Sequence, residues 1–145
     1  MSAAQAWFIA GTIVAIVAGA LHMVYALVDT VRPTYFAPVD RSVRPAMEGT
    51  GLRLGRRFGA RRSLWSVWLG IHIGFGLGIL LFGLLCLAIA ADDFSLVERV
   101  DAIRPLTIAF SAGYLALSLR FFFSAPAIIT GVATACFTIA TLLSL

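Results

Sequence analysis

Residues 64–91 read LWSVWLGIHIGFGLGILLFGLLCLAIAA, and this stretch contains no charged side chain. A helix needs about 20 apolar residues to cross the roughly 30 Å hydrocarbon core of a bilayer, and this stretch is longer than that. Strands are excluded, because isolated strands would leave their backbone groups without hydrogen bonds in lipid. The stretch therefore predicts a transmembrane helix and, with it, an integral membrane protein.

Three further apolar stretches cover residues 6–28, 105–123 and 125–145. The chain of 145 residues is 61% hydrophobic and only 12% charged, whereas about 25% of the residues in a soluble domain are charged. A chain of this length is expected to form a single domain. We therefore predict an all-α fold in which residues 1–145 form one four-helix up-down bundle in a membrane.

The arginines of the chain predict its orientation in that membrane. The loop of residues 29–63 has eight Arg and three acidic residues, whereas residues 92–104 have two Arg and four acidic residues. Cytoplasmic loops carry the excess of positive charge, so residues 29–63 are predicted to be cytoplasmic and both termini to lie outside. Anionic lipid headgroups are the expected partners of the basic loop. No nucleic-acid recognition module fits the rest of the chain, so we predict no nucleic-acid binding.

Within the basic loop, residues 52–58 read LRLGRRF and have two interpretations. The run could lie on the membrane surface with Leu52, Leu54 and Phe58 inserted between the lipids. Alternatively, it is a solvated basic loop that only fixes the topology. The sequence leaves both interpretations open.

The two histidines of the chain are predicted to lie at one depth in the membrane. His22 lies six residues before Val28, or about 9 Å along a helix, and His72 lies eight residues beyond Leu64, or about 12 Å. Tyr114 is predicted to lie at a similar level. An ionisable residue inside a membrane span suggests a functional site.

The leading hypothesis is a site for an amphiphilic small molecule (a lipid, quinone or isoprenoid) near the cytoplasmic leaflet. His could act there as an acid or base near neutral pH, and Arg could bind a phosphate or carboxylate headgroup. Whether the protein also converts the molecule is left open. The predicted ligand-binding residues are His22, Tyr25, Asp29, Arg32, His72, Tyr114 and Arg120, of which Asp29, Arg32 and Arg120 form the polar mouth.

Two alternatives remain open. His22 and His72 could ligate one b-type haem between neighbouring helices, which is the one metal site that the sequence suggests. The chain could instead be a non-enzymatic accessory or assembly subunit of a membrane complex. In each case the bundle is predicted to be oligomeric, because Gly70, Gly74 and Gly78, spaced four residues apart, would let a helix of a second copy or of a partner subunit approach closely.

Several residues of the first two spans and their loop form a recognisable pattern. It runs from Leu21-His22-x-x-Tyr25 through Asp29, Pro33, Pro38 and Met47 to Leu64-Trp65-x-x-Trp68-x-Gly70-x-His72 and Gly78. In this pattern the chain resembles a family of uncharacterised four-helix bacterial membrane proteins. The resemblance implies the predicted topology, a location in the bacterial inner membrane and an important role for His72. It implies no activity.

Overall fold

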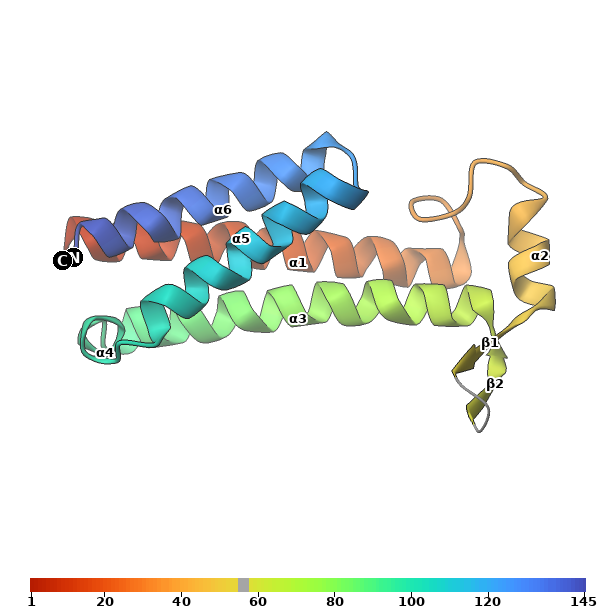
Figure 1. Ribbon diagram of the computed structural model, residues 1–145, viewed down its shortest axis with the longest axis horizontal. Coiled ribbons are helices and arrows are strands. Elements are labelled where there is room, and N and C mark those ends of the chain that lie inside the picture. The colour runs from red at the N-terminus through yellow and green to blue at the C-terminus, as the bar shows by residue number, and fades with distance from the viewer. Residues whose placement is uncertain (55–57) are drawn as a thin grey trace. The chain divides into compact units, whose positions relative to one another are not determined.

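The computed structural model describes residues 1–54 and 58–145, and these residues are mostly helical. The elements, in chain order, are α1 (Ala3–Val31), α2 (Val43–Gly49), β1 (Gly51–Leu54), β2 (Phe58–Ser63), α3 (Leu64–Asp92), α4 (Ser95–Arg99), α5 (Ile103–Phe121) and α6 (Ser124–Leu142) (Figure 1). The predicted all-α class is confirmed, apart from the short hairpin formed by β1 and β2.

Three helices of the described chain, α1, α3 and α6, are long and apolar enough to cross a membrane. They indicate a membrane protein. The helix over the predicted third span, α5, is not among them, because Arg104 and Arg120 lie near its two ends and lower its mean hydropathy. The structure thus supports three of the four predicted spans.

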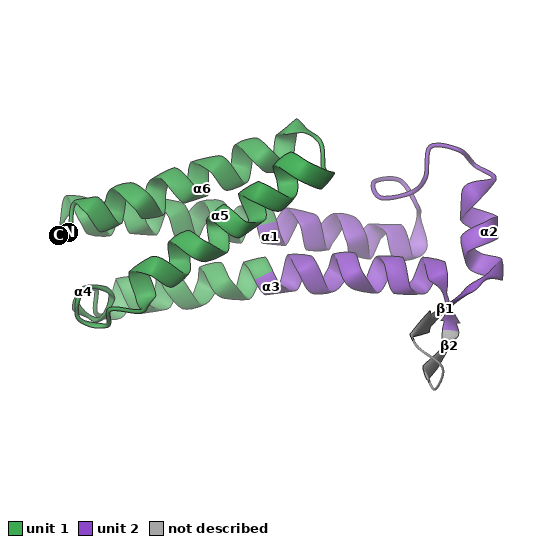
Figure 2. Ribbon diagram, viewed as in Figure 1, with its two compact units in different colours: residues 1–18, 79–145 green, residues 19–78 purple. Residues whose placement is uncertain are grey.

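The chain forms two compact units (Figure 2). Unit 1 consists of residues 1–18 and 79–145, and unit 2 consists of residues 19–78. The helices α1 and α3 contribute to both units, whereas α5 and α6 belong to unit 1 and the hairpin belongs to unit 2.

The core of unit 1 is apolar and rich in aromatic rings. Phe8 is buried between Phe137 and Phe94, with ring centroids 5.2 Å and 5.9 Å away in edge-to-face contacts. Such contacts stabilise an aromatic core beyond the area that they bury. Val97 of the short helix α4 is also buried in this core, so the connection between α3 and α5 packs onto the helices.

The threonine hydroxyls of α6 are satisfied within their own helix. Thr130, Thr134, Thr138 and Thr141 each donate a hydrogen bond to the backbone carbonyl four residues earlier, at 2.7–2.9 Å. Hydroxyls in membrane helices commonly satisfy themselves in this way. The row of threonines therefore needs no polar partner outside α6.

Unit 2 connects α1 to α3 through α2 and the hairpin. In the hairpin, Arg53 pairs with Gly59 and Leu54 pairs with Phe58 in antiparallel register. The turn of the LRLGRRF run, residues 55–57, lies outside the described residues, as does the predicted insertion of the side chains of Leu54 and Phe58. Arg44 of α2 forms an ion pair with Glu48 at 2.8 Å.

Candidate functional site

The two histidines are in direct contact in unit 2. Nε2 of His22 on α1 lies 3.1 Å from Nδ1 of His72 on α3, which is a hydrogen-bonding distance. The two helices come this close because Gly76 has no side chain: a Cβ there would lie 2.7 Å from the backbone nitrogen of Met23. The predicted proximity of the two histidines is confirmed.

Three aromatic side chains surround the histidine pair. Phe36 is stacked on His72, with ring centroids 4.2 Å apart and an interplanar angle of 13°. Trp68 meets His72 edge to face at 4.5 Å, and Phe75 lies 5.0 Å from His22. We call Phe36, Trp68 and Phe75 the aromatic cage.

One polar atom of this site has no hydrogen-bond partner among the described residues. It is Nε2 of His72, a side chain that is only 9% exposed. Nδ1 of His72 is engaged with His22, so Nε2 is left as a free donor or a free acceptor, depending on the tautomer. A buried polar group without a partner costs about 1–3 kcal/mol, so this atom is suited to a partner from outside the chain.

Asp29 is fully buried at 0% exposure and binds its own loop. Its carboxylate accepts hydrogen bonds from the backbone N–H groups of Thr34 at 2.7 Å, Tyr35 at 2.9 Å and Phe36 at 2.6 Å. With three donors satisfying it, the carboxylate is not at a polar mouth as predicted. It holds the loop instead.

The segment held by Asp29, residues 33–36, folds back over the histidine pair, and we call it the strap. The carbonyl oxygen of Phe36 accepts a hydrogen bond of 3.1 Å from Nε1 of Trp68. The ring of Tyr35 stacks on Tyr25, with centroids 4.3 Å apart. Asp29, Trp68 and Tyr25 therefore fix the strap, and the strap fixes Phe36 against His72.

Only part of the predicted site is brought together. His22, His72, Tyr25 and Asp29 belong to unit 2 and are linked by the contacts above. Arg32 belongs to unit 2 as well, and it is exposed. The remaining two predicted residues, Tyr114 and Arg120, belong to unit 1.

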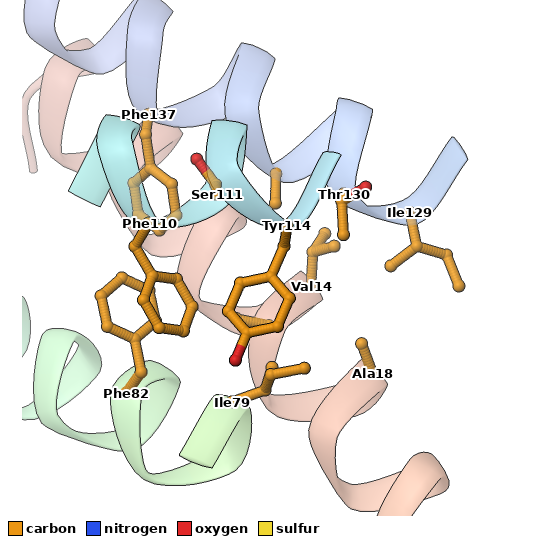
Figure 3. A pocket seen from close by; sticks show the side chains of 12 residues that line it. Val14, Ala18, Ile79, Phe82, Phe110, Ser111, Tyr114, Ile129, Thr130 and Phe137 are labelled. Atoms are coloured by element: carbon orange, nitrogen blue, oxygen red, sulfur yellow. The ribbon is translucent and has the colours of Figure 1, made fainter. Parts of the chain in front are cut away.

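Tyr114 lines a small pocket within unit 1 (Figure 3). Phe82 and Phe110 are stacked beside it, and the Tyr114 hydroxyl points toward Ile79. The cavity measures about 40 Å³, and a single water needs about 10–15 Å³ by this measure. The lining residues are mostly apolar and include neither histidine. This pocket is therefore too small and too apolar to be the predicted headgroup site.

The geometry of the histidine pair does not fit the haem alternative. An imidazole binds a metal at about 2 Å, so two nitrogens on opposite sides of one metal lie about 4 Å apart. The two nitrogens here are 3.1 Å apart and face each other at a hydrogen-bonding distance, which leaves no room for a metal between them. Within residues 1–54 and 58–145, no group of three or more His, Cys, Asp or Glu side chains is placed to hold a metal.

The two sets of glycines on α3 have different surroundings. A Cβ at Gly83 would lie 2.8 Å from Ile16, so Gly83, like Gly76, is a point of close packing. At Gly70, Gly74 and Gly78, a Cβ would meet no described atom within 4 Å. The predicted packing role of these three glycines therefore stays a prediction about a partner helix.

No protein-family model, no curated protein and no solved structure matches this chain. The sequence alone identified the two histidines, but it did not identify the aromatic cage. Trp68 and Phe75 lie four residues before and three residues after His72, so helical spacing could have placed them near it. Phe36 lies in a loop, where no such periodicity exists.

Proposed function

We propose that this protein is a four-helix up-down bundle of the bacterial inner membrane that binds an amphiphilic small molecule through His72. The observation that carries the proposal is the buried Nε2 of His72, which has no partner among the described residues. A carbonyl, hydroxyl or acidic group of a lipid, quinone or isoprenoid would supply the missing hydrogen bond.

The surroundings of the histidine pair support a ligand with an apolar body. Trp68 provides aromatic surface against His72 and Phe75 against His22, and ligand sites typically combine such surface with few polar groups. The contact between His22 and His72 also gives the site a route for a proton, because an imidazole accepts at one nitrogen and donates at the other. Conversion of the ligand by acid–base chemistry is therefore left open.

The proposed orientation places residues 29–63 in the cytoplasm and both termini outside. The charge asymmetry of the two loops supports it. The proposal needs α5 to cross the membrane with α1, α3 and α6. Arg104 and Arg120, near the two ends of α5, would then lie at the two membrane surfaces, where long side chains reach the headgroups. In this orientation Arg32 and the other arginines of the first loop would face anionic lipids.

A second candidate function, an accessory subunit of a membrane complex, is favoured by a different observation. Gly70, Gly74 and Gly78 form a line on α3 that no described residue covers. Such a line allows the backbones of two membrane helices to approach closely. A partner subunit or a second copy of this chain would cover it.

The test of the binding proposal is the co-purified ligand. Native mass spectrometry of the protein released from detergent is expected to show a bound molecule of lipid size in the wild type. The signal should be lost in His72→Ala and kept in the control Ile71→Ala, whose side chain is 60% exposed on the same helix. Equal occupancy in the wild type and in a folded His72→Ala protein would refute the site, and recovery only with another polypeptide would favour the accessory role.

A further inference from the structure

The position of Phe36 narrows the class of ligand, given the binding site proposed at His72. We infer that the ring of Phe36 occupies the place of the ligand's headgroup, and that this headgroup is a planar ring bearing a carbonyl or hydroxyl oxygen. The strap then acts as a gate: it closes the site with Phe36 and opens when the ligand ring replaces that side chain.

The ring of Phe36 fills a flat space beside the two histidines. Phe36 lies nearly parallel to His72, at an interplanar angle of 13° and a centroid distance of 4.2 Å, and it also lies 4.7 Å from His22. The space on this face of the imidazole is therefore shaped for one flat ring. A ligand ring that displaces Phe36 could pack against the same face. To satisfy Nε2 of His72, which bonds in the plane of the imidazole, that ring tilts from the parallel orientation of Phe36 and brings an oxygen to the ring edge, which a phenyl group cannot do.

The side chain and the backbone of Phe36 are held by different contacts. Its side chain contacts His72 by stacking and His22 at a tilt of 39°, and an aromatic contact is worth about two- to tenfold in an equilibrium constant. Its backbone is held separately, by the carboxylate of Asp29 and by Nε1 of Trp68. The ring can thus be displaced by a competitor, while the polar contacts of Asp29 decide how firmly the strap is closed.

The site offers a ligand headgroup only one polar contact among the described residues. Nε2 of His72 provides one hydrogen bond, which suits a single carbonyl or hydroxyl oxygen. A phosphate headgroup is typically bound by several donors, often from Arg. A quinone-like ring on an apolar tail therefore fits the site better than an isoprenoid phosphate or a phospholipid.

The experiment uses the full-length protein with Trp68 as its only tryptophan, in a Trp7→Phe, Trp65→Phe background. The probe is a benzoquinone with a decyl tail, which quenches tryptophan fluorescence on contact. We expect saturable quenching in this background. The matched competitor is a cyclohexane-1,4-dione with the same tail and two oxygens but a puckered ring, which does not quench. Its Kd, measured from the fluorescence that it restores by displacing the quinone, should be at least tenfold higher than the Kd of the quinone.

Two variants test the gate in different ways. Phe36→Ala removes the competing ring, and Asp29→Asn weakens the hold on the strap while leaving that ring in place. Phe36→Ala should bind the quinone about two- to tenfold more tightly, and Asp29→Asn should also bind it more tightly than its parent. The control Phe121→Ala, a residue 70% exposed in unit 1, should bind like its parent.

The outcomes separate this inference from the function on which it rests. Equal displacement by the dione would overturn the planar ring, and unchanged or weaker binding in both strap variants would overturn the gate. Absence of quinone quenching in every variant would overturn the whole inference. The binding function itself would still stand if mass spectrometry showed a His72-dependent lipid.

Discussion

The two compact units differ in how they satisfy their buried polar groups. In unit 1, buried Thr107 and Ser111 donate to carbonyls of their own helix, and the surrounding core is made of rings such as Phe8 and Phe137. In unit 2, buried Asp29 and His72 depend on partners from other segments of the chain. The buried hydroxyls of Thr107 and Ser111 are thus satisfied within one helix, whereas the buried Asp29 and His72 of unit 2 are bonded to groups outside their own helices.

This difference shows where function is to be expected in an apolar helical protein. Burying an unpaired polar group is costly, so a chain retains one only where it is compensated or used. Every described polar contact of Asp29 is made within unit 2, yet Nε2 of His72 is left over. The leftover atom distinguishes the unit 2 site from the small pocket beside Tyr114, which is lined by apolar groups and is too small for a headgroup.

The largest effect is expected for Asp29→Ala, which removes the acceptor of three backbone N–H groups in unit 2. Loss of these charge-assisted hydrogen bonds should destabilise the strap by about 3 kcal/mol, or roughly a hundredfold in its opening equilibrium. Amide hydrogen exchange at Thr34, Tyr35 and Phe36 should accelerate accordingly. Thr30→Ala is the control, because that exposed hydroxyl only binds its own helix at Leu27. Unchanged amide exchange in Asp29→Ala would show that the carboxylate does not hold the strap, and the contrast between the buried polar groups of the two units would be wrong.

A smaller effect is expected for Phe137→Ala in unit 1. The variant leaves a cavity beside Phe8 and Phe82, and the lost packing should lower the stability by about 2 kcal/mol. This is less than for a phenylalanine in a soluble core, because the side chain moves into lipid and not into water when the helices separate. Thermal unfolding in detergent is the measurement. Phe123→Ala, at a position that is 69% exposed, should unfold like the wild type. Equal melting temperatures for both variants would contradict the packed core of unit 1.

The glycines of α3 give a comparison within one helix. Gly76→Ala places a Cβ 2.7 Å from the backbone of Met23 and should lower stability by about 1–2 kcal/mol through overpacking. Gly74→Ala meets no described atom within 4 Å, so the isolated chain should tolerate it. If Gly74→Ala instead disrupts an oligomer seen by size-exclusion chromatography with light scattering, the predicted partner face is supported. If Gly76→Ala leaves the stability unchanged, the result contradicts the close approach of α1 and α3 at this residue.

The smallest effect is expected at Asp93, just beyond the end of α3. Hydrogen bonds from the Ser95 hydroxyl, and then the Ser95 N–H and Arg99, hold the pKa of this carboxyl below its ordinary value of 3.8. A group whose folded-state pKa is lowered stabilises the fold fully above its unfolded pKa and loses that contribution as the pH falls through the folded value. Asp93→Asn should therefore lower the melting temperature slightly at neutral pH, and the difference should vanish toward about pH 2. A difference that grows in acid would contradict this linkage.

Much of the fold could be predicted from the sequence, because length and hydropathy are local properties. The stretch at residues 64–91 predicts α3 to within one residue, and residues 6–28 lie inside α1. The third predicted span is the one that the structure does not support as a membrane span, because Arg104 and Arg120 bring the mean hydropathy of α5 below that of α1, α3 and α6. The hairpin was not predicted, since residues 51–63 show no regular alternation of apolar and polar side chains.

The candidate site could be predicted only in part. His22 and His72 were identified because ionisable residues are rare inside apolar spans, and equal depth suggested their contact. Asp29 was assigned to a headgroup because it lies near a membrane boundary, but the carboxylate bends back onto its own loop. The sequence does not predict the role of Phe36, because a loop residue has no periodicity that places it near His72, 36 residues further along the chain.

Composition and residue order are enough to predict a helical protein that is apolar enough for a membrane and has two histidines in its apolar spans. These properties follow from side-chain chemistry summed along one dimension. Three facts emerge only when the chain is folded: the histidines touch, Phe36 stacks on His72, and one imidazole nitrogen has no partner among the described residues. Such facts depend on distances between atoms far apart in the chain, and these are set by how glycines such as Gly76 let helices approach.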